Sequence, residues 1–323
     1  MLKITLAICA YNAARYIEET LKCIANQTLQ NFDLLIINDC STDNTIDIIE
    51  SVLSSLNQNY RLINLEQNGG IANARQMALE QAKTKYVVFV DADDLPHPTL
   101  LEEEYKLISS DSNIMAVSCW SEFIDEKSKR IKGGLMMGFQ TKEDFINKAS
   151  REKLIFLPIQ TMIDREAALS VGGFNLSGFP EGKPRYRDFC EDLDLWTRMS
   201  DLYAKGRYII TIPKVLYSYR KAGGGLSANS VSMTLKMKYV KRNLKLRRAG
   251  NPELTFIDFM QTITHEELKK IERDTINGDR LRNGVMLLSK GNIFKGGYWV
   301  MHSIIANPKY FWQKIKANSR IFR

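Results

Sequence analysis

Three carboxylates at the end of a predicted strand are the residues best suited to chemistry in this sequence. Tyr86-Val87-Val88-Phe89-Val90 is an unbroken apolar run, and Asp91-Ala92-Asp93-Asp94 follows it directly. An apolar run without alternating polar residues predicts a strand buried on both faces, and open α/β sheets bind ligands at the carboxyl ends of such strands. Carboxylate oxygens are ligands that Mg²⁺ and Mn²⁺ prefer. Taken alone, an acidic cluster of this kind is more often an ordinary turn.

A second acidic pair, Glu191-Asp192, begins a predicted helix after the long loop from Gly172 to Cys190. A loop of this length inside a compact domain is typical of an active-site loop or a lid. Carboxylates in the first turn of a helix are stabilised in their charged form, so they stay available as a general base. Simple helix N-terminal chemistry explains the same pair without any catalytic role.

A repeating strand–helix pattern in the first hundred residues must position these carboxylates. The predicted strands cover residues 4–9, 32–38, 61–65 and 86–90. The predicted helices cover residues 13–27, the segment after the loop 39–44 to about residue 56, and residues 71–83. This alternation predicts right-handed crossovers and an α/β fold, with a mostly parallel, Rossmann-like sheet flanked by helices.

The order of elements changes after the acidic cluster. We expect helices over residues 98–110, 142–150, 165–171 and 191–205, strands over 114–120, 161–163 and 208–212, and a hairpin or loop over 125–132. From residue 230 onward the pattern is helical. We therefore predict two domains, residues 1–228 and residues 229–323, joined near the flexible segment Gly223-Gly224-Gly225.

Composition excludes several classes of protein. The chain has 323 residues with an ordinary globular composition, and no apolar run approaches the 18 residues of a spanning helix. It enters a strand pattern directly, so no signal peptide is expected. Its five cysteines are scattered, which favours reduced thiols in the cytoplasm over a disulfide framework or a zinc site.

The positive charge is concentrated near the C-terminus. Residues 281–323 contain eight Lys or Arg and no acidic residue, so this segment alone equals the net charge of +8. Tyr298, Trp299 and Trp312 are interspersed with these cations. Basic amphipathic helices with aromatic residues are typical of segments on an anionic membrane surface. A solvated basic face over an ordinary helical domain is the alternative; nucleic-acid binding has only the charge in its favour.

Five short motifs each lie at a predicted strand or helix end. They are Ala10-Tyr11-Asn12, Asn38-Asp39-Cys40-Ser41-Thr42-Asp43, Asn68-Gly69-Gly70 with Ala74-Arg75, Asp91-Ala92-Asp93-Asp94, and Glu191-Asp192-Leu193-Asp194-Leu195-Trp196. In this order they resemble the family 2 glycosyltransferases of bacterial surface-polysaccharide synthesis, which are inverting enzymes with the GT-A fold. The resemblance covers roughly residues 3–220.

The resemblance implies roles for these residues. Asp93 would bind Mn²⁺ or Mg²⁺, and Asp91 would bind the ribose or help to hold the metal. Asp192, or else Glu191, would be the catalytic base. The remaining residues implied to bind the nucleotide sugar are Ala10, Tyr11, Asn12, Asp39, Asn68, Arg75 and Ala92.

The same positions also have structural explanations. Asp39, implied to accept the uracil N–H, could instead form a turn. Arg75 could be a solvated surface arginine, and Asp94 a helix-flanking acid. Family members often carry a histidine where this chain has Ala222. Arg220, Lys221 or glycine backbone N–H groups could contact the diphosphate instead, or the glycines could be a simple hinge.

The resemblance therefore implies metal-dependent transfer of a sugar from a nucleotide-diphosphate donor, with UDP-sugars favoured, to a hydroxyl of a glycan or lipid-linked saccharide. Cell-surface polysaccharide synthesis at the inner face of the cell membrane, with peripheral attachment and no nucleic-acid partner, is the expected setting. A nucleotide-sugar-binding scaffold without turnover is the alternative. A nucleotidylyltransferase is disfavoured because Tyr11-Asn12-Ala13-Ala14 lacks phosphate-loop glycines.

Overall fold

A computed structural model describes residues 2–221, 229–289, 291–308 and 311–312 of the chain. Contacts divide the chain into two compact units: Met1–Gly223 with Val240–Glu253, and Gly224–Tyr239 with Leu254–Arg323. The division into two domains, residues 1–228 and 229–323, stays a prediction, because units defined by contacts need not be domains that fold independently.

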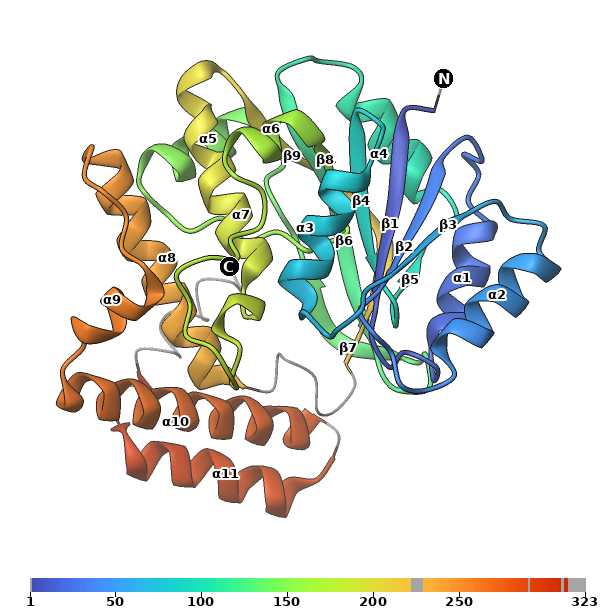
Figure 1. Cartoon of the computed structure of the whole chain (residues 1–323). Coiled ribbons are helices and arrows are strands. Elements are labelled where there is room, and N and C mark those ends of the chain that lie inside the picture. Colours follow the sequence, from blue (N-terminus) through green and yellow to red (C-terminus); the bar gives the residue numbers. More distant parts are fainter. Residues whose placement is uncertain (1, 222–228, 290, 309–310, 313–323) are drawn as a thin grey trace. The chain divides into compact units, whose positions relative to one another are not determined.

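A nine-stranded sheet forms the centre of the first unit (Figure 1). Its order is β3-β2-β1-β4-β8-β6-β9-β5, with β7 paired to β6. The neighbours β1 to β4 are parallel, as the strand–helix alternation predicts, whereas β8 is antiparallel to both β4 and β6. The strands are β1 (Ile4–Ala10), β2 (Asp33–Asn38), β3 (Arg61–Asn64), β4 (Tyr86–Asp91), β5 (Leu95–Pro96), β6 (Ile114–Ile124), β7 (Arg130–Met136), β8 (Met162–Asp164) and β9 (Tyr208–Arg220).

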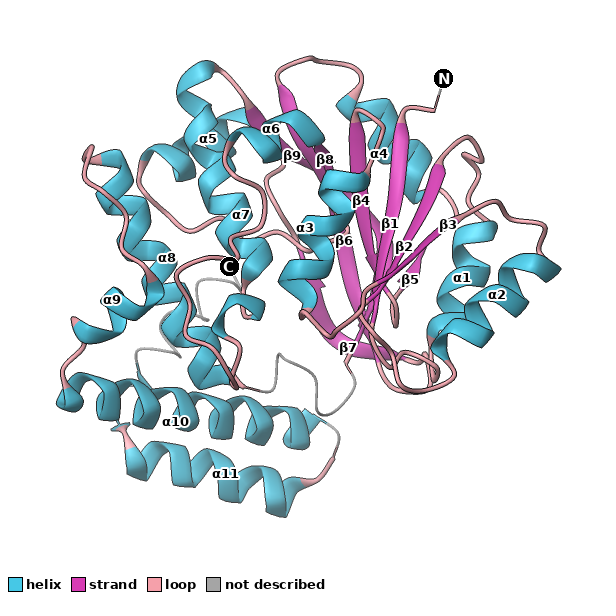
Figure 2. Ribbon diagram, in the orientation of Figure 1, coloured by secondary structure: helices cyan, strands magenta, loops and turns pink. Residues whose placement is uncertain are grey.

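Helices flank this sheet, and Figure 2 shows them in cyan. Helix α3 packs against β1 and β2, and α4 packs against β6. The helices of the first unit are α1 (Ile17–Ala25), α2 (Thr45–Ser55), α3 (Ile71–Gln81), α4 (Leu100–Ile108), α5 (Lys142–Ser150), α6 (Arg165–Ser170) and α7 (Glu191–Met199), with short 3₁₀ turns at Tyr186–Asp188 and Ser200–Lys205.

The parallel strands end at one edge of the sheet. Strand β4 is buried over residues 86–90, as its unbroken apolar run predicts. In the ladder Cys9 lies beside Asp91, and Ala10 lies beside Asn38. The segments that follow β1, β2 and β4 therefore emerge next to one another, and they contain the predicted site residues.

Strand β9 is longer than predicted. The sequence suggests a strand that ends at Ile212, before Pro213, but the strand continues to Arg220. Its pairing with β6 shifts in register, since Cys119 pairs with Ile212 and Trp120 with Val215. Proline donates no ladder hydrogen bond, so the two intervening residues form a bulge and the strand resumes after it. This extension brings the end of β9 to the acidic cluster.

The second unit is helical. Helix α8 (Ser230–Arg248) contributes its first part to this unit, followed by α9 (Phe256–Gln261), α10 (His265–Ser289) and α11 (Ile293–Ala306). Tyr239 stacks edge-on against Phe256 and Phe259 at the start of the unit. In the described parts of the chain, no helix combines the length and apolarity needed to span a bilayer.

Candidate active site

The loops after β1 and β2 are joined by hydrogen bonds. The Asn12 backbone N–H donates to Ser41 Oγ (3.0 Å), and the Thr42 N–H donates to Asn12 Oδ1 (2.7 Å). The Ala10 carbonyl accepts from the Asp39 N–H (2.8 Å). Tyr11 is half exposed between them. The first two predicted motifs thus form one wall, on which the Tyr11 ring is open to solvent.

Asp39 is buried and supports the turn that precedes α3. Its Oδ1 accepts from the Gly69 N–H (2.7 Å), and its Oδ2 accepts from the Gly70 N–H (2.8 Å) and Asn68 Nδ2 (3.0 Å). Burial raises the pKa of Asp39, while the two glycine N–H groups oppose that rise. Asp39 therefore stabilises the Asn68-Gly69-Gly70 turn, and its contact with a nucleotide base stays a prediction.

The end of the long loop forms hydrogen bonds with the carbonyl groups of the same turn. Arg185 donates to the Asn68 carbonyl (2.8 Å), and Arg187 donates to the Gly69 carbonyl (2.8 Å). The buried Asp188 carboxylate accepts from a backbone N–H in the first turn of α3 (3.2 Å). These contacts connect the Asn68-Gly69-Gly70 turn to the segment that leads into Glu191-Asp192.

The sequence analysis missed Arg185, Arg187 and Asp188. One available signal was Gly70, which has φ +87° and lies so close to Asp188 that a Cβ would collide with its carboxylate. A required glycine indicates a close approach by another part of the chain, but the sequence does not identify the partner.

The start of the long loop is anchored as well. Arg198 of α7 donates to the Gly173 carbonyl (2.6 Å), and the Phe174 N–H donates to the Gln76 side chain of α3 (2.7 Å). Residues 180–184 between the two anchored ends are all exposed. The loop is thus fixed at both ends and open to solvent in its middle.

Arg75 joins the two predicted groups of carboxylates. Its guanidinium pairs with Asp91 (2.5 Å) and with Glu191, and its side chain is 7% exposed. The alternative of a solvated surface arginine is therefore wrong. Because Asp91 ends β4 and Glu191 begins α7, the Arg75 side chain connects segments a hundred residues apart in sequence.

Asp93 and Asp94 are crowded by burial and by like charge. Burial and the neighbouring Asp91 raise the pKa of Asp93 to about 6. Asp94 accepts from the Arg220 N–H (2.7 Å), and its buried carboxyl group also has a hydrogen bond with the buried Tyr217 hydroxyl. The alternative of Asp94 as a solvated helix-flanking acid is wrong.

Arg220, at the end of β9, forms part of the wall of the acidic cluster. Its side chain is buried and donates to the Asp93 carbonyl (2.6 Å), to Asp125 (3.1 Å) and to Glu19 (2.8 Å). A guanidinium with these partners is not placed to contact a diphosphate, so the structure does not support that hypothesis. Ala222 and the following glycines lie outside the described residues.

Glu191 and Asp192 differ in their surroundings. Burial raises the pKa of Glu191 to about 8, even though Arg75 lowers it. Burial also raises the pKa of the half-buried Asp192, whose carboxylate accepts from the N–H of the next residue (2.7 Å). In the described part of the chain Asp192 makes no ion pair. Asp192 is therefore the more available of the two as a base.

The acidic cluster fits a divalent cation that a diphosphate helps to hold. The described residues contain no group of three or more His, Cys, Asp or Glu side chains arranged around a common point. Mg²⁺ sites in phosphate-transfer enzymes often use only one or two carboxylates, with substrate oxygens and water completing the shell. Asp91 and Asp93 supply such a pair; burial and the like charge of Asp91 raise the pKa of Asp93, and a bound cation would offset both.

Sequence comparisons point to one family. The profile described as Glycosyl transferase family 2 matches residues 5–172. An uncharacterized glycosyltransferase of Haemophilus influenzae is 30% identical over 70% of this chain and 67% of its own length. A putative teichuronic acid biosynthesis glycosyltransferase, TuaG of Bacillus subtilis, is 26% identical over 80% of this chain and 95% of its own length.

Solved structures share the fold. Staphylococcus aureus TarS, residues 1–349 in complex with UDP-GlcNAc, superposes with a TM-score of 0.59 at 18% identity, covering 98% of this chain and 92% of that one. The mannosyltransferase PcManGT of Pyrobaculum calidifontis, in complex with GDP-Man and Mn²⁺, gives 0.54 at 20% identity over 97% and 88%. These matches confirm the predicted α/β fold of the GT-A type.

Proposed function

Because the chain belongs to glycosyl transferase family 2, we propose that it moves a sugar from a nucleotide-diphosphate sugar to an acceptor hydroxyl with inversion at the anomeric carbon. The observation that carries the proposal is the meeting of two carboxylate groups at Arg75: Asp91 from the end of β4 and Glu191 from the start of α7. Inverting transfer needs one group to handle the leaving diphosphate and another to deprotonate the acceptor.

Asp192 is the proposed base. It accepts the proton of the acceptor hydroxyl as that oxygen attacks the anomeric carbon, and the bond from this carbon to the diphosphate oxygen breaks on the opposite side. Glu191, held by Arg75, fixes the start of α7 and thereby orients Asp192. Asp91 and Asp93 would hold Mn²⁺ or Mg²⁺, which would neutralise charge on the leaving nucleoside diphosphate.

UDP-sugars are the favoured donors, since the TarS structure contains UDP-GlcNAc. The proposed base contact is Asp39, and Tyr11, Asn12, Asn68 and Ala92 lie on the loops that would surround the nucleotide. The proposed acceptor is a glycan or a lipid-linked saccharide, in keeping with the teichuronic acid assignment of the TuaG relative. We place the reaction at the inner face of the cell membrane, with the protein attached peripherally.

Two variants test whether Asp93 and Asp192 have the separate roles proposed for them. Asp93→Ala and Asp192→Ala should both abolish transfer, but only Asp93→Ala should weaken Mn²⁺-dependent nucleotide binding, measured by titration calorimetry. A panel of UDP-, GDP- and dTDP-sugars with Mn²⁺ first identifies the donor. Full activity of Asp192→Ala would reject it as the base. Release of no sugar from any donor by the native chain would instead favour the scaffold alternative.

A further inference from the structure

Helix α11 packs on α10 through one of its sides. Gly284 of α10 and Gly296 of α11 approach so closely that a Cβ on Gly284 would lie 3.0 Å from the Gly296 carbonyl oxygen and 2.9 Å from Val300. Farther along, Asn277 Nδ2 donates to the Ser303 carbonyl (3.1 Å), and Ser303 Oγ donates back to the Asn277 carbonyl (3.2 Å). The side of α11 that faces α10 is therefore defined by residues 296, 300 and 303.

The opposite side of α11 is apolar and exposed. Phe294 is 94% exposed, Tyr298 61%, Met301 56% and Ile305 74%. Their spacings of four, three and four residues place them on one face of the helix, and residues 296, 300 and 303 fall on the other. We call these four residues the apolar stripe. Burying such side chains is favourable, so a stripe of large apolar side chains left in water is unusual.

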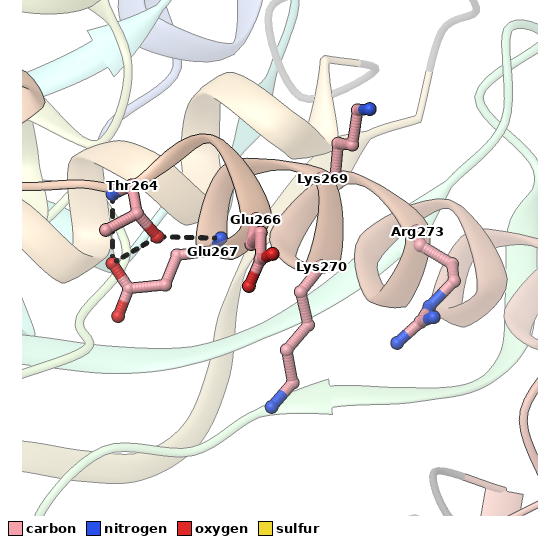
Figure 3. A pocket seen from close by; sticks show the side chains of 6 residues that line it. All are labelled: Thr264, Glu266, Glu267, Lys269, Lys270 and Arg273. Atoms are coloured by element: carbon pink, nitrogen blue, oxygen red, sulfur yellow. Dashed lines mark hydrogen bonds between the residues drawn. The ribbon is translucent and has the colours of Figure 1, made fainter.

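The apolar character continues at the adjoining end of α10 and is absent from its beginning. Val285, Met286 and Leu288, near the C-terminus of α10, are exposed. At the N-terminal end a pocket is lined by Thr264 and by side chains of both charges; Glu267 accepts from the Thr264 N–H there (3.1 Å), and Figure 3 shows this capping interaction. That end of α10 is an ordinary solvated face.

The charge of the sequence segment that contains the stripe indicates what covers it. Lys295 is the only Lys, Arg, Asp or Glu residue of α11, and the sequence of residues 281–323 has eight Lys or Arg and no acid; Arg282 and Lys295 are the two that lie in the described residues. The other basic run, residues 236–248, is partly used inside the protein, because Lys236 is buried and Arg247 and Arg248 pair with Asp201. An anionic lipid surface matches an exposed apolar stripe within a segment whose sequence is rich in Lys and Arg. A second copy of the chain would bring an equal positive charge.

We propose that the apolar stripe of α11 is the surface that enters an anionic membrane, with the helix lying in the plane of the lipid headgroups. The proposal rests on the membrane setting suggested above, and it names the side chains responsible. A helix of 14 residues is about 21 Å long, shorter than the roughly 30 Å hydrocarbon core, which suits a helix that lies along the surface.

Vesicle flotation with the full chain tests the proposal. The vesicles are phosphatidylglycerol mixed with phosphatidylcholine, compared with phosphatidylcholine alone; no donor, acceptor or metal is present, so the result is independent of transferase activity. The double variant Phe294→Asp/Ile305→Asp should bind the anionic vesicles at least about tenfold more weakly. Ile257→Asp is the matched control, because Ile257 of α9 is 45% exposed and lies outside the stripe.

Two results with the double variant would overturn the proposal, and one result with the control variant would do so as well. One is binding by the double variant that equals the native chain, with circular dichroism showing both folded. The other is sedimentation that shows a lipid-free dimer of the native chain and a monomer of the double variant, because the stripe would then be a contact between copies. Weaker binding by Ile257→Asp equal to that of the double variant would also reject a role specific to α11.

Discussion

Two turns at the same edge of the sheet are built in opposite ways. The Asn68-Gly69-Gly70 turn after β3 has its N–H groups bound by Asp39 and two of its carbonyls bound by Arg185 and Arg187. The turn Asp91-Ala92-Asp93-Asp94 at the end of β4 has three acidic residues in four positions, and burial together with like charge raises the pKa of Asp93 and of Asp94.

This difference predicts that the Asn68-Gly69-Gly70 turn contributes to stability, whereas the Asp91-Ala92-Asp93-Asp94 turn contributes to binding. The first turn satisfies its polar groups without any ligand, so changes there should cost folding free energy. The second turn keeps acidic groups in surroundings that disfavour their charge, an arrangement typical of functional sites. Changes there should reduce activity and leave stability equal or higher.

The largest expected effect is that of Asp93→Asn on transfer. Removing one cation ligand should lower the transfer rate about a thousandfold, which corresponds to ~4 kcal/mol of transition-state stabilisation. The melting temperature should be equal or higher, because the amide removes a buried like charge. Initial rates and calorimetric unfolding measure the two quantities. A clear loss of stability in this variant would contradict the proposed contrast.

Gly70→Ala should cause the largest loss of stability. Its φ is +87°, and the added Cβ would collide with the Asp188 carboxylate, so we expect a cost of about 2–4 kcal/mol. Gly182→Ala is the matched control: its φ is +88°, but nothing lies within 4 Å of the added Cβ, so only the backbone cost of about 1 kcal/mol remains. Equal losses in urea denaturation would show that the Asp188 contact is unimportant.

Asp39→Asn should weaken the first turn by a smaller amount. One amide group cannot accept all three hydrogen bonds that the carboxylate accepts from Asn68, Gly69 and Gly70, so we expect a loss of about 1–3 kcal/mol. Urea unfolding measures this loss, and titration with UDP measures any accompanying loss of affinity. Undiminished stability would mean that the turn does not depend on Asp39.

The smallest expected effect, a pH-dependent gain, comes from a buried carboxylate outside both turns. Glu104 of α4 is fully buried, and burial raises its pKa well above the ordinary 4.5. Above pH 4.5 the unfolded chain loses this proton while the folded chain retains it, so stability falls as pH rises through that window. Glu104→Gln should therefore gain about 1–2 kcal/mol at pH 8 and nothing below pH 4.5.

Thermal unfolding of the native chain and Glu104→Gln across this pH range checks the expected gain. A gain that is constant with pH would exclude titration of Glu104 as its cause. The comparison also provides a reference for the two turns. It measures by how much one buried carboxylate outside both turns lowers the free energy of unfolding.

The sequence predicted the local features of the site and missed its long-range contacts. The alternation of strands and helices was sufficient to align the ends of β1, β2 and β4, and the unbroken run 86–90 located the acidic cluster. Arg185 and Arg187 form hydrogen bonds with the Asn68-Gly69-Gly70 turn, over a hundred residues earlier. These contacts depend on the path of an irregular loop, and such a loop has no periodicity from which its path could be predicted. The bulge at Pro213 was missed because proline usually ends a strand.

The anchoring of the long loop at both ends has a consequence for how acceptor preference can change. Residues 173–174 and 185–188 are held to α3, α7 and the turn after β3, while residues 180–184 are exposed. A segment whose ends are fixed can be replaced or lengthened at small entropic cost. We therefore propose that exchanging residues 180–184 changes the acceptor preference while the carboxylates keep their positions.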